Sequence, residues 1–309
     1  MEVIFILLIA LAIDLVFGEP PDSWHPVAWV GRLISLEMKW VPRRGRVIPL
    51  VFGIVTVLLA LGIVTAPLYF LFFYLREISP VIYVIVAGLL LKFTFSLRGL
   101  NQSAATAGGF LAQDKLADAR TSVRSLVSRD TANLNKSQLV SATVESVAEN
   151  TCDSFIAPLF YFLLFGVPGA IAYRIVNTFD AMIGYHGEWE YSGKFTARLD
   201  DVANFIPARI SALLIVLAAW LCRKDAGQAW RTMLRDHKKT ESPNAGWTMS
   251  AIAGALGVQL EKPGHYRLGD NHGSLSVTTI DASRQMIMMV ALIWSLVSIL
   301  GEVIYRVTT

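Results

Sequence analysis

The sequence predicts an all-α membrane protein with about five to six membrane segments, joined by polar segments that are themselves helical. Hydrophobic residues make up 54% of the 309 positions and charged residues 17%, whereas a soluble domain has about 45–50% apolar and about 25% charged residues. The mean hydropathy is +0.51. The apolar residues form long continuous runs rather than alternating, and this favours helices that cross a bilayer over strands.

A helix needs about 20 apolar residues to cross the hydrocarbon core of a bilayer. Six runs approach that length, at residues 2–17, 48–75, 81–97, 155–183, 206–222 and 286–304. Gly166-Val167-Pro168-Gly169 interrupts the fourth run and should kink or split its helix. The first run follows Glu2, where a signal peptide would carry Lys or Arg, so we expect it to be retained. We therefore expect one integral membrane domain over residues 1–309.

The polar connections set the expected orientation. We expect 98–154 and 223–285 to be helical, because helix-forming residues dominate both segments. Basic residues gather in 18–47, 98–154 and 223–285, so the positive-inside rule places these in the cytoplasm of a multi-pass protein of the cell (inner) membrane. Counting spans then places 184–205 outside. Segment 184–205 could still belong to a cytoplasmic site in two ways. The fourth run could be re-entrant, or 184–205 could dip toward a cavity within the membrane that is reached from the cytoplasm. The sequence leaves both topologies open.

Several functional classes are excluded or lack support. The net charge of +3 is too small to predict nucleic-acid binding, and no basic patch contains interleaved aromatic residues. There is no phosphate-binding P-loop, no dinucleotide fingerprint, no histidine pair with zinc-ligand spacing and no nucleophile elbow. Cys152 and Cys222 are the only cysteines, and we interpret both as small apolar fillers.

Three carboxylates share one face of a predicted helix. Glu145, Glu149 and Asp153 follow one another at intervals of four, which places them within about 80° of one another on a helix. They would repel one another unless a cation lies among them, and Mg²⁺ held partly through substrate phosphates fits this need. A solvated acidic face, or pairing with Arg120 or Arg124, explains the pattern equally well.

A second polar group lies within an apolar run. Arg174, Asn177 and Asp180 are three residues apart, and ionisable side chains at membrane depth usually face a cavity or a partner. Arg174 alone could extend to the membrane interface, but Asn177 and Asp180 could not. We therefore predict that this face is functional.

A third group is Arg198, Asp200, Asp201 and Arg209, where one aspartate can bind a ligand while the other pairs with an arginine. The alternative is an ordinary helix start, at which aspartate is favoured by the helix dipole.

Two shorter motifs complete the candidates. Ser242 to Trp247, with Asn244 between them, reads as a turn that opens a helix running to about residue 256, and such a turn can bind an anion. Asp14 lies inside the first apolar run, where a carboxylate indicates function. His25 follows shortly after it and could equally be a structural residue at the interface.

At these same positions the sequence resembles the CobD/CbiB family of cobalamin biosynthesis. Each motif is weak alone, but together they occur in the family's order and span nearly the whole chain. Cys152-Asp153-Ser154 and Glu19 depart mildly from the family pattern without removing a carboxylate. The matching stretches are DLVFGEPPDSWHPV at 14–27, SRDT at 128–131, ESVAENTCDS at 145–154, APL at 157–159, VNTFDAMIGY at 176–185, ARLDDVANFIPAR at 197–209 and SPNAGW at 242–247.

The resemblance implies a ligase that uses ATP and Mg²⁺. The family joins a carboxylate of adenosylcobyric acid to the amine of (R)-1-aminopropan-2-ol O-phosphate, or of ethanolamine phosphate, to give adenosylcobinamide phosphate. The expected partners are thus the corrinoid, the amino-alcohol phosphate, ATP and the lipid bilayer, with no nucleic acid. The sequence leaves a homo-oligomer, or association with other membrane enzymes of cobalamin assembly, open.

Roles can be assigned to the matched residues as hypotheses. Asp180 would be the base that accepts the proton of the incoming ammonium, with help from Asn177, and Glu149 would act at the reacting phosphate. The expected Mg²⁺ ligands are Glu145, Glu149, Asp153, Asp200 and Asp201. The expected substrate or phosphate contacts are Arg129, Arg174, Arg198, Arg209, Asn150, Asp14, His25, Ser242 and Asn244.

Two other functions remain as alternatives. One is a non-enzymatic membrane signalling protein similar to the AmpE group. The other is a transporter of corrinoids or small molecules, in which Asp14, Arg174 and Asp180 would line a substrate path.

Overall fold

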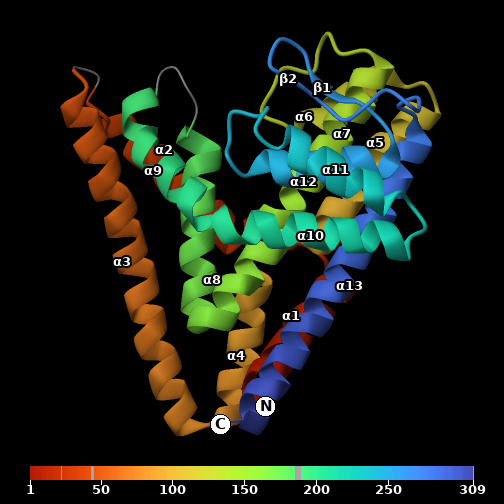
Figure 1. Cartoon of the computed structure of the whole chain (residues 1–309). Helices are drawn as coiled ribbons and strands as arrows, with labels where there is room; N and C mark the ends of the chain where they lie inside the picture. The colour runs from red at the N-terminus through yellow and green to blue at the C-terminus, as the bar shows by residue number, and fades with distance from the viewer. Residues whose placement is uncertain (22, 43–44, 185–188, 309) are drawn as a thin grey trace. The chain divides into compact units, whose positions relative to one another are not determined.

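The computed structural model describes residues 1–21, 23–42, 45–184 and 189–308. These residues are almost entirely helical, and the strands among them form one two-stranded hairpin (Figure 1). The predicted all-α class is confirmed. Four helical segments are long and apolar enough to cross a membrane: Val47–Ile78, Pro80–Ala112, Lys136–Ile183 and Val277–Thr308. Glu190–Ala203 with Phe205–Leu221 would be a fifth if the pair counts as one span.

The chain forms two compact units, each described by itself. The first contains Met1–Ser96, Ala157–Asn204 and Ile299–Thr309, and the second contains Leu97–Ile156 and Phe205–Ser298. The helices of the first unit are α1 (Glu2–Phe17), α2 (Pro26–Glu37), η1 (Met38–Trp40), α3 (Val47–Ile78), α4 (Pro80–Lys92), α8 (Ala157–Ile183) and α9 (Glu190–Ala203).

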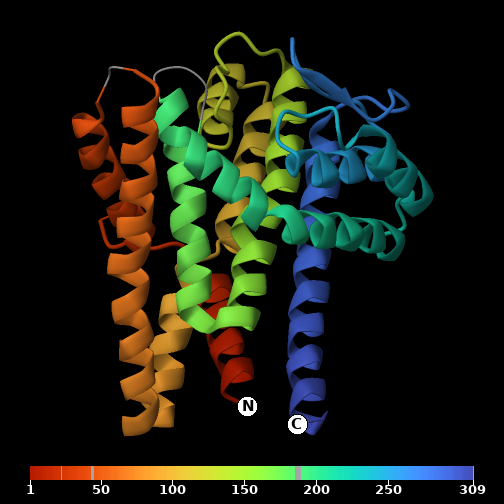
Figure 2. The ribbon, with the colours of Figure 1, turned by 60° about the vertical axis from the view of Figure 1, so that its left-hand side comes forward.

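In the first unit, α3 packs along α9 and α8, and α1 packs along α4 (Figure 2 shows α9 beside the upper part of α3). The α3–α9 contact is unusually close. A Cβ atom on Gly53 of α3 would lie 2.0 Å from the backbone oxygen of Ser192 in α9. A hydrophobic core that includes Ile34, Val57 and Phe179 joins α2, α3 and α8.

The second unit surrounds α7 and α12. Its elements are α5 (Leu97–Ala112), α6 (Leu116–Arg124), α7 (Lys136–Thr151), the π-helical turn η2 (Cys152–Ile156), α10 (Phe205–Leu221), α11 (Ala226–Asp236), α12 (Ala245–Leu256), β1 (Leu260–Lys262), β2 (Tyr266–Leu268) and most of α13 (Val277–Thr308). Small residues let α12 approach α11 closely, since a Cβ on Gly254 would lie 2.5 Å from the Gln228 backbone oxygen. Both helices are thereby fixed against each other.

Local sequence explains the helix boundaries. Ser79 caps α4 by accepting a hydrogen bond from the Ile82 N–H, with Pro80 at the first helical position. Asn135 and Gln138 form a reciprocal capping box at the start of α7. Within α8, Gly166 has φ 68°, a left-handed conformation that suits glycine, and it breaks the helix where the motif predicted an interruption.

The structure corrects the prediction at several connections. Segment 223–285 is not helical throughout, because β1 and β2 form an antiparallel hairpin inside it. Pro263 and Gly264, the latter with φ 79°, provide the residues of a type II turn. The last helix begins at Val277 rather than near 286, and most of 184–205 is helix α9, although 185–188 lie outside the described residues. Helix α1 has 16 residues and is not among the helices that are long and apolar enough to cross a membrane.

Candidate functional site

The acidic face of α7 begins with Glu145, which is buried and fully engaged by protein donors. Its carboxylate accepts hydrogen bonds from the hydroxyls of Ser141, at 2.6 Å, and Tyr266, at 2.9 Å. The guanidinium of Arg129 lies 3.3 Å from the same carboxylate. The cationic partner is thus Arg129, and not the Arg120 or Arg124 considered from sequence. A buried carboxylate needs such donors, because an unpaired charge away from water is costly.

Glu149 and Asp153 continue this face and are half-buried. Asp153 lies in the π-helical turn that follows α7, a feature often found at functional sites. No three His, Cys, Asp or Glu side chains in the described part of the chain are arranged to hold a metal ion together. Mg²⁺, however, usually takes only one or two protein carboxylates and completes its shell with phosphates and water. Glu149 and Asp153 are two carboxylates on this face that stay partly exposed, which suits such a requirement, whereas Glu145 is buried.

Asn150, expected to contact substrate, takes part in a polar chain along the same helix. Its amide nitrogen donates to the Ser146 backbone oxygen at 3.0 Å, and its amide oxygen accepts from Ser154 at 3.2 Å. These contacts orient the amide beside Glu149.

In the first unit, Asp200 is the centre of a hydrogen-bond network between α8 and α9. Asn204 donates to it at 2.9 Å and Asn177 at 3.4 Å. Tyr173 donates in turn to Asn204 at 2.9 Å, and Arg174 donates to Asn177 at 3.2 Å. The structure therefore brings together two of the motifs that sequence treated separately, the one around Asn177 and the one around Asp200.

The position of the two aspartates argues against an ordinary helix start. Asp200 and Asp201 lie in the last turn of α9 rather than its first, where the helix dipole disfavours negative charge. Arg198 pairs with Asp201 at 3.3 Å but is itself 75% exposed, so this ion pair adds little stability. Asp180 is half-buried, one turn beyond Asn177 on the same helix.

A third cluster, also in the first unit, holds Asp14 and His25. Lys92, at the end of α4, is 2% exposed and lies 3.1 Å from Asp14 and 2.7 Å from Glu19. His25 caps α2, because its Nδ1 accepts from the Val27 N–H, and its Nε2 therefore donates to Glu19 at 2.8 Å. Burial raises the pKa of Glu19, but the hydrogen bonds from His25 and Lys92 outweigh it and lower that pKa to about 2.

Arg209 and the start of α12 form the fourth cluster, within the second unit. The guanidinium lies 3.6 Å from the ring centre of Phe205 and 4.9 Å from that of Trp247, so it is held between two aromatic faces. One nitrogen, Nη1, donates to the Asn244 side chain at 3.0 Å and to the Phe205 backbone oxygen at 2.5 Å. Ser242 accepts from the N–H groups of Asn244 and Ala245, so the turn predicted to open this helix is confirmed.

This cluster leaves donors without acceptors. The Nε and Nη2 atoms of Arg209 have no acceptor among the described residues, and neither has the buried indole N–H of Trp247. A buried donor without an acceptor is rare and needs a physical explanation. The guanidinium edge of Arg209 is of the kind that binds phosphate through two parallel hydrogen bonds.

Sequence reasoning missed three residues of these clusters. Lys92 lies within the predicted apolar run 81–97, and an ionisable residue at such a position could have been singled out. Tyr173 and Tyr266 gave no such signal, because their hydroxyls gain a role only through distant partners.

These features define an integral membrane protein of the helical type, with buried carboxylate and amide networks and an arginine held against two aromatic rings. Comparison with known proteins gives the family. The model of the family described as CobD/Cbib protein matches residues 7–292, and the chain belongs to the CobD/CbiB family.

Curated relatives cover nearly the whole chain. A protein of Dehalococcoides mccartyi named cobalamin biosynthesis protein CobD is 50% identical over 97% of each chain. A probable cobalamin biosynthesis protein CobD of Methanothermobacter thermautotrophicus is 43% identical, over 87% of this chain and 88% of its own. A cobalamin biosynthesis protein CobD of Klebsiella pneumoniae is 41% identical, over 84% and 82% respectively. No solved structure matches the chain.

Proposed function

We propose that this protein acts in cobalamin biosynthesis as an ATP-dependent ligase, which joins a carboxylate of adenosylcobyric acid to (R)-1-aminopropan-2-ol O-phosphate, or to ethanolamine phosphate, and forms adenosylcobinamide phosphate. Family membership supports the role in cobalamin biosynthesis. The apolar helices support a place in the membrane. We place the protein in the cell membrane with its site open to the cytoplasm, because ATP is there.

The observation that carries the proposal is the Arg209 cluster with its unsatisfied donors. Both the amine substrate and ATP present phosphate groups, and an arginine fork beside a helix start is suited to bind one. The faces of Phe205 and Trp247 fix the guanidinium, so little side-chain entropy is lost when a phosphate binds. Ser242 and Asn244 shape the turn that presents the first N–H groups of α12.

The chemistry requires the carboxylate to be activated. A carboxylate oxygen attacks the γ-phosphorus of ATP, ADP leaves, and an acyl phosphate forms. The amine nitrogen then attacks the acyl carbon, the C–O bond to phosphate breaks, and inorganic phosphate leaves. The amine must first lose a proton from its ammonium form, and we assign that proton to Asp180, beside Asn177.

Mg²⁺ would neutralise charge on the reacting phosphates. We assign Glu149 and Asp153, both in the second unit, as its protein ligands. Glu145 instead positions Arg129 and Tyr266, since its carboxylate is filled by their donors and by Ser141. Asn204, Asn177 and Arg174 orient Asp200 from α8 and α9.

The test is product formation by the purified protein in detergent. Adenosylcobyric acid, each amine phosphate and Mg-ATP are supplied, and mass spectrometry detects the amide. Arg209→Gln should raise the KM for the phosphate-bearing substrate roughly ten- to a hundredfold, the value of one or two charge-assisted hydrogen bonds. Trp247→Phe removes the N–H donor and keeps a smaller aromatic ring, and it should raise KM roughly three- to tenfold.

Arg231→Gln is the matched control, because Arg231 lies on α11 of the same unit and, among the described residues, donates only to Gln228. The proposal is wrong if folded wild-type protein makes no amide from either amine. Movement of unchanged corrinoid across sealed vesicles would then favour the transporter.

A further inference from the structure

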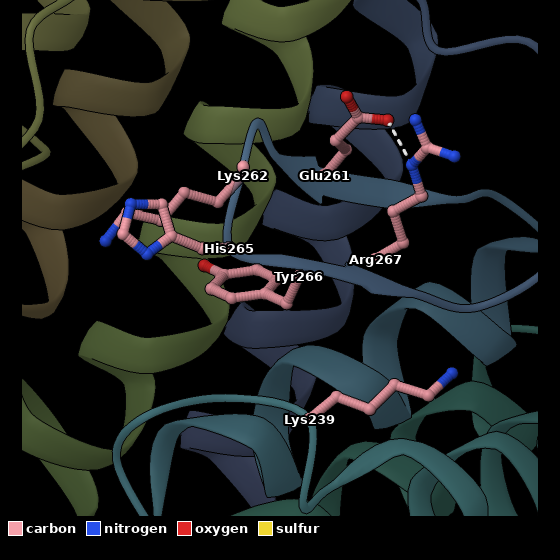
Figure 3. Close-up of a pocket in the computed structure, with 7 residues that line it drawn as sticks. Lys239, Glu261, Lys262, His265, Tyr266 and Arg267 are labelled. Atoms are coloured by element: carbon pink, nitrogen blue, oxygen red, sulfur yellow. Dashed lines mark hydrogen bonds and ion pairs between the residues drawn. The ribbon is translucent and has the colours of Figure 1, made fainter.

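The β1–β2 hairpin lines an open, basic pocket that the proposed roles do not use. Its volume is about 580 Å³, and it is lined by Lys239, Glu261, Lys262, Gly264, His265, Tyr266 and Arg267, all within the second unit (Figure 3). That volume lies in the range of small-molecule sites and is far larger than a single phosphate ion needs.

The pocket carries an excess of positive charge. Lys239, Lys262 and Arg267 are permanent cations, against one carboxylate, Glu261. Arg267 is paired with Glu261 at 2.9 Å, and Lys239 is paired with the buried Asp236 at 2.6 Å. Lys262 has no ion-pair partner in the described part of the chain. Its charge is therefore available to an anionic ligand.

The hairpin is attached to the acidic helix α7 by both of its strands. The N–H of Glu261 in β1 donates to Ser141 at 2.8 Å, and the hydroxyl of Tyr266 in β2 donates to Glu145 at 2.9 Å. Figure 3 shows the Tyr266 ring between the His265 side of the hairpin and the Glu261–Arg267 pair. Ser141 and Glu145 are one helical turn apart, so α7 determines where the pocket lies.

Glu149 is one turn further along the same face of α7 than Glu145. Burial raises the pKa of Tyr266, and the negative charges of Glu145 and Glu149 raise it further, which means that Glu149 lies close enough to act on this hydroxyl. The buried Nε of Arg129, on the other side of Glu145, has no acceptor in the described structure. Through Tyr266, the basic pocket is thus connected to the acidic face of α7.

From this arrangement we infer that the hairpin pocket binds the phosphates of a nucleoside triphosphate, with Lys262 as a principal phosphate contact. The inference rests on the proposed ATP dependence and names the subsite that ATP would take. A triphosphate requires cationic contacts, and Lys262 supplies one that has no ion-pair partner among the described residues. Its phosphates would be separate from the phosphate bound by Arg209.

The experiment measures equilibrium binding of a non-hydrolysable ATP analogue with Mg²⁺ to the full-length protein in detergent. Lys262→Gln should raise the dissociation constant of the analogue roughly ten- to a hundredfold. Lys262→Glu should raise it further. Lys262→Arg keeps the charge and should restore most of the affinity. Affinity should fall as salt is raised, because ions screen these charges.

Lys224→Gln is the control, because it removes an exposed lysine of the same unit that does not line the pocket. Thermal unfolding of each variant checks that it is folded. Parallel titrations use aminopropanol phosphate and inorganic phosphate as the probes. If Lys262→Gln weakens binding of the nucleotide analogue alone, the inference is supported. If Lys262→Gln weakens binding of aminopropanol phosphate alone, the pocket belongs to the amine substrate and the inference is overturned.

Unchanged analogue affinity in Lys262→Gln and Lys262→Glu also overturns the inference. If wild-type protein forms the amide while these variants bind nucleotide normally, only the pocket assignment fails. If wild-type protein forms no amide yet binds the analogue through Lys262, the ligase proposal fails and the nucleotide site stands.

Discussion

Lys92 gives the sharpest test of how the first unit is stabilised. Its ammonium is 2% exposed and lies between the carboxylates of Asp14, which is 1% exposed, and Glu19. Replacing Lys92 by Met keeps the length of the side chain but leaves Asp14 buried without its cation. Breaking a buried ion pair by removing one partner costs about 3–5 kcal/mol. We therefore expect the free energy of unfolding to fall by roughly that amount.

A double-mutant cycle separates the ion pair from simple packing. Asp14→Asn alone should also destabilise the protein, because Lys92 then loses one of its two carboxylate partners. The double variant Asp14→Asn with Lys92→Met removes both charges, and it should be more stable than the sum of the two single changes predicts. Unfolding is followed by intrinsic fluorescence during titration with a denaturing detergent.

The reasoning is refuted if Lys92→Met unfolds at the same point as wild type, or if the two single effects simply add. Additive effects would mean that Lys92 and Asp14 contribute independently, through packing against α1 and α4. A coupling energy on the order of 1–3 kcal/mol is the expected result.

Two further predictions concern the same unit. The pKa of Glu19 is lowered from 4.5 to about 2, so the folded state holds this proton more weakly than the unfolded chain does. The contribution of the Glu19 carboxylate to stability should therefore be complete above about pH 4.5 and lost as the pH falls toward 2. Glu19→Gln should remove that part of the acid sensitivity, and an unchanged pH profile of unfolding would contradict the assignment. Gly53→Ala should destabilise the protein by about 1–3 kcal/mol, because its Cβ would meet the α9 backbone at 2.0 Å. Gly62→Ala on the same helix has open space and should be neutral or slightly stabilising, so equal effects at the two glycines would show that the close contact is not the cause.

The sequence alone determined the class and most of the helices, because both depend on local patterns. Long apolar runs predicted the helices around residues 48–75 and 155–183, and Gly166 predicted the break within the second. Regular spacing placed Glu145 and Glu149 on one face of α7. The hairpin was missed although Pro263 and Gly264 are typical turn residues. Its strands have only three residues each, which is too short to show the alternation of apolar and polar residues that predicts a strand.

The tertiary structure decided which of the candidate residues act together. Glu145 was expected to bind a metal, yet its carboxylate meets Arg129 and Tyr266, the latter 121 positions away. Lys92 lies 73 positions from Glu19, and no local pattern joins them. Helical periodicity reports which side chains share a face, but the partner of a buried charge depends on which distant element packs against that face. Burial makes such a partner necessary, and only the folded chain supplies it.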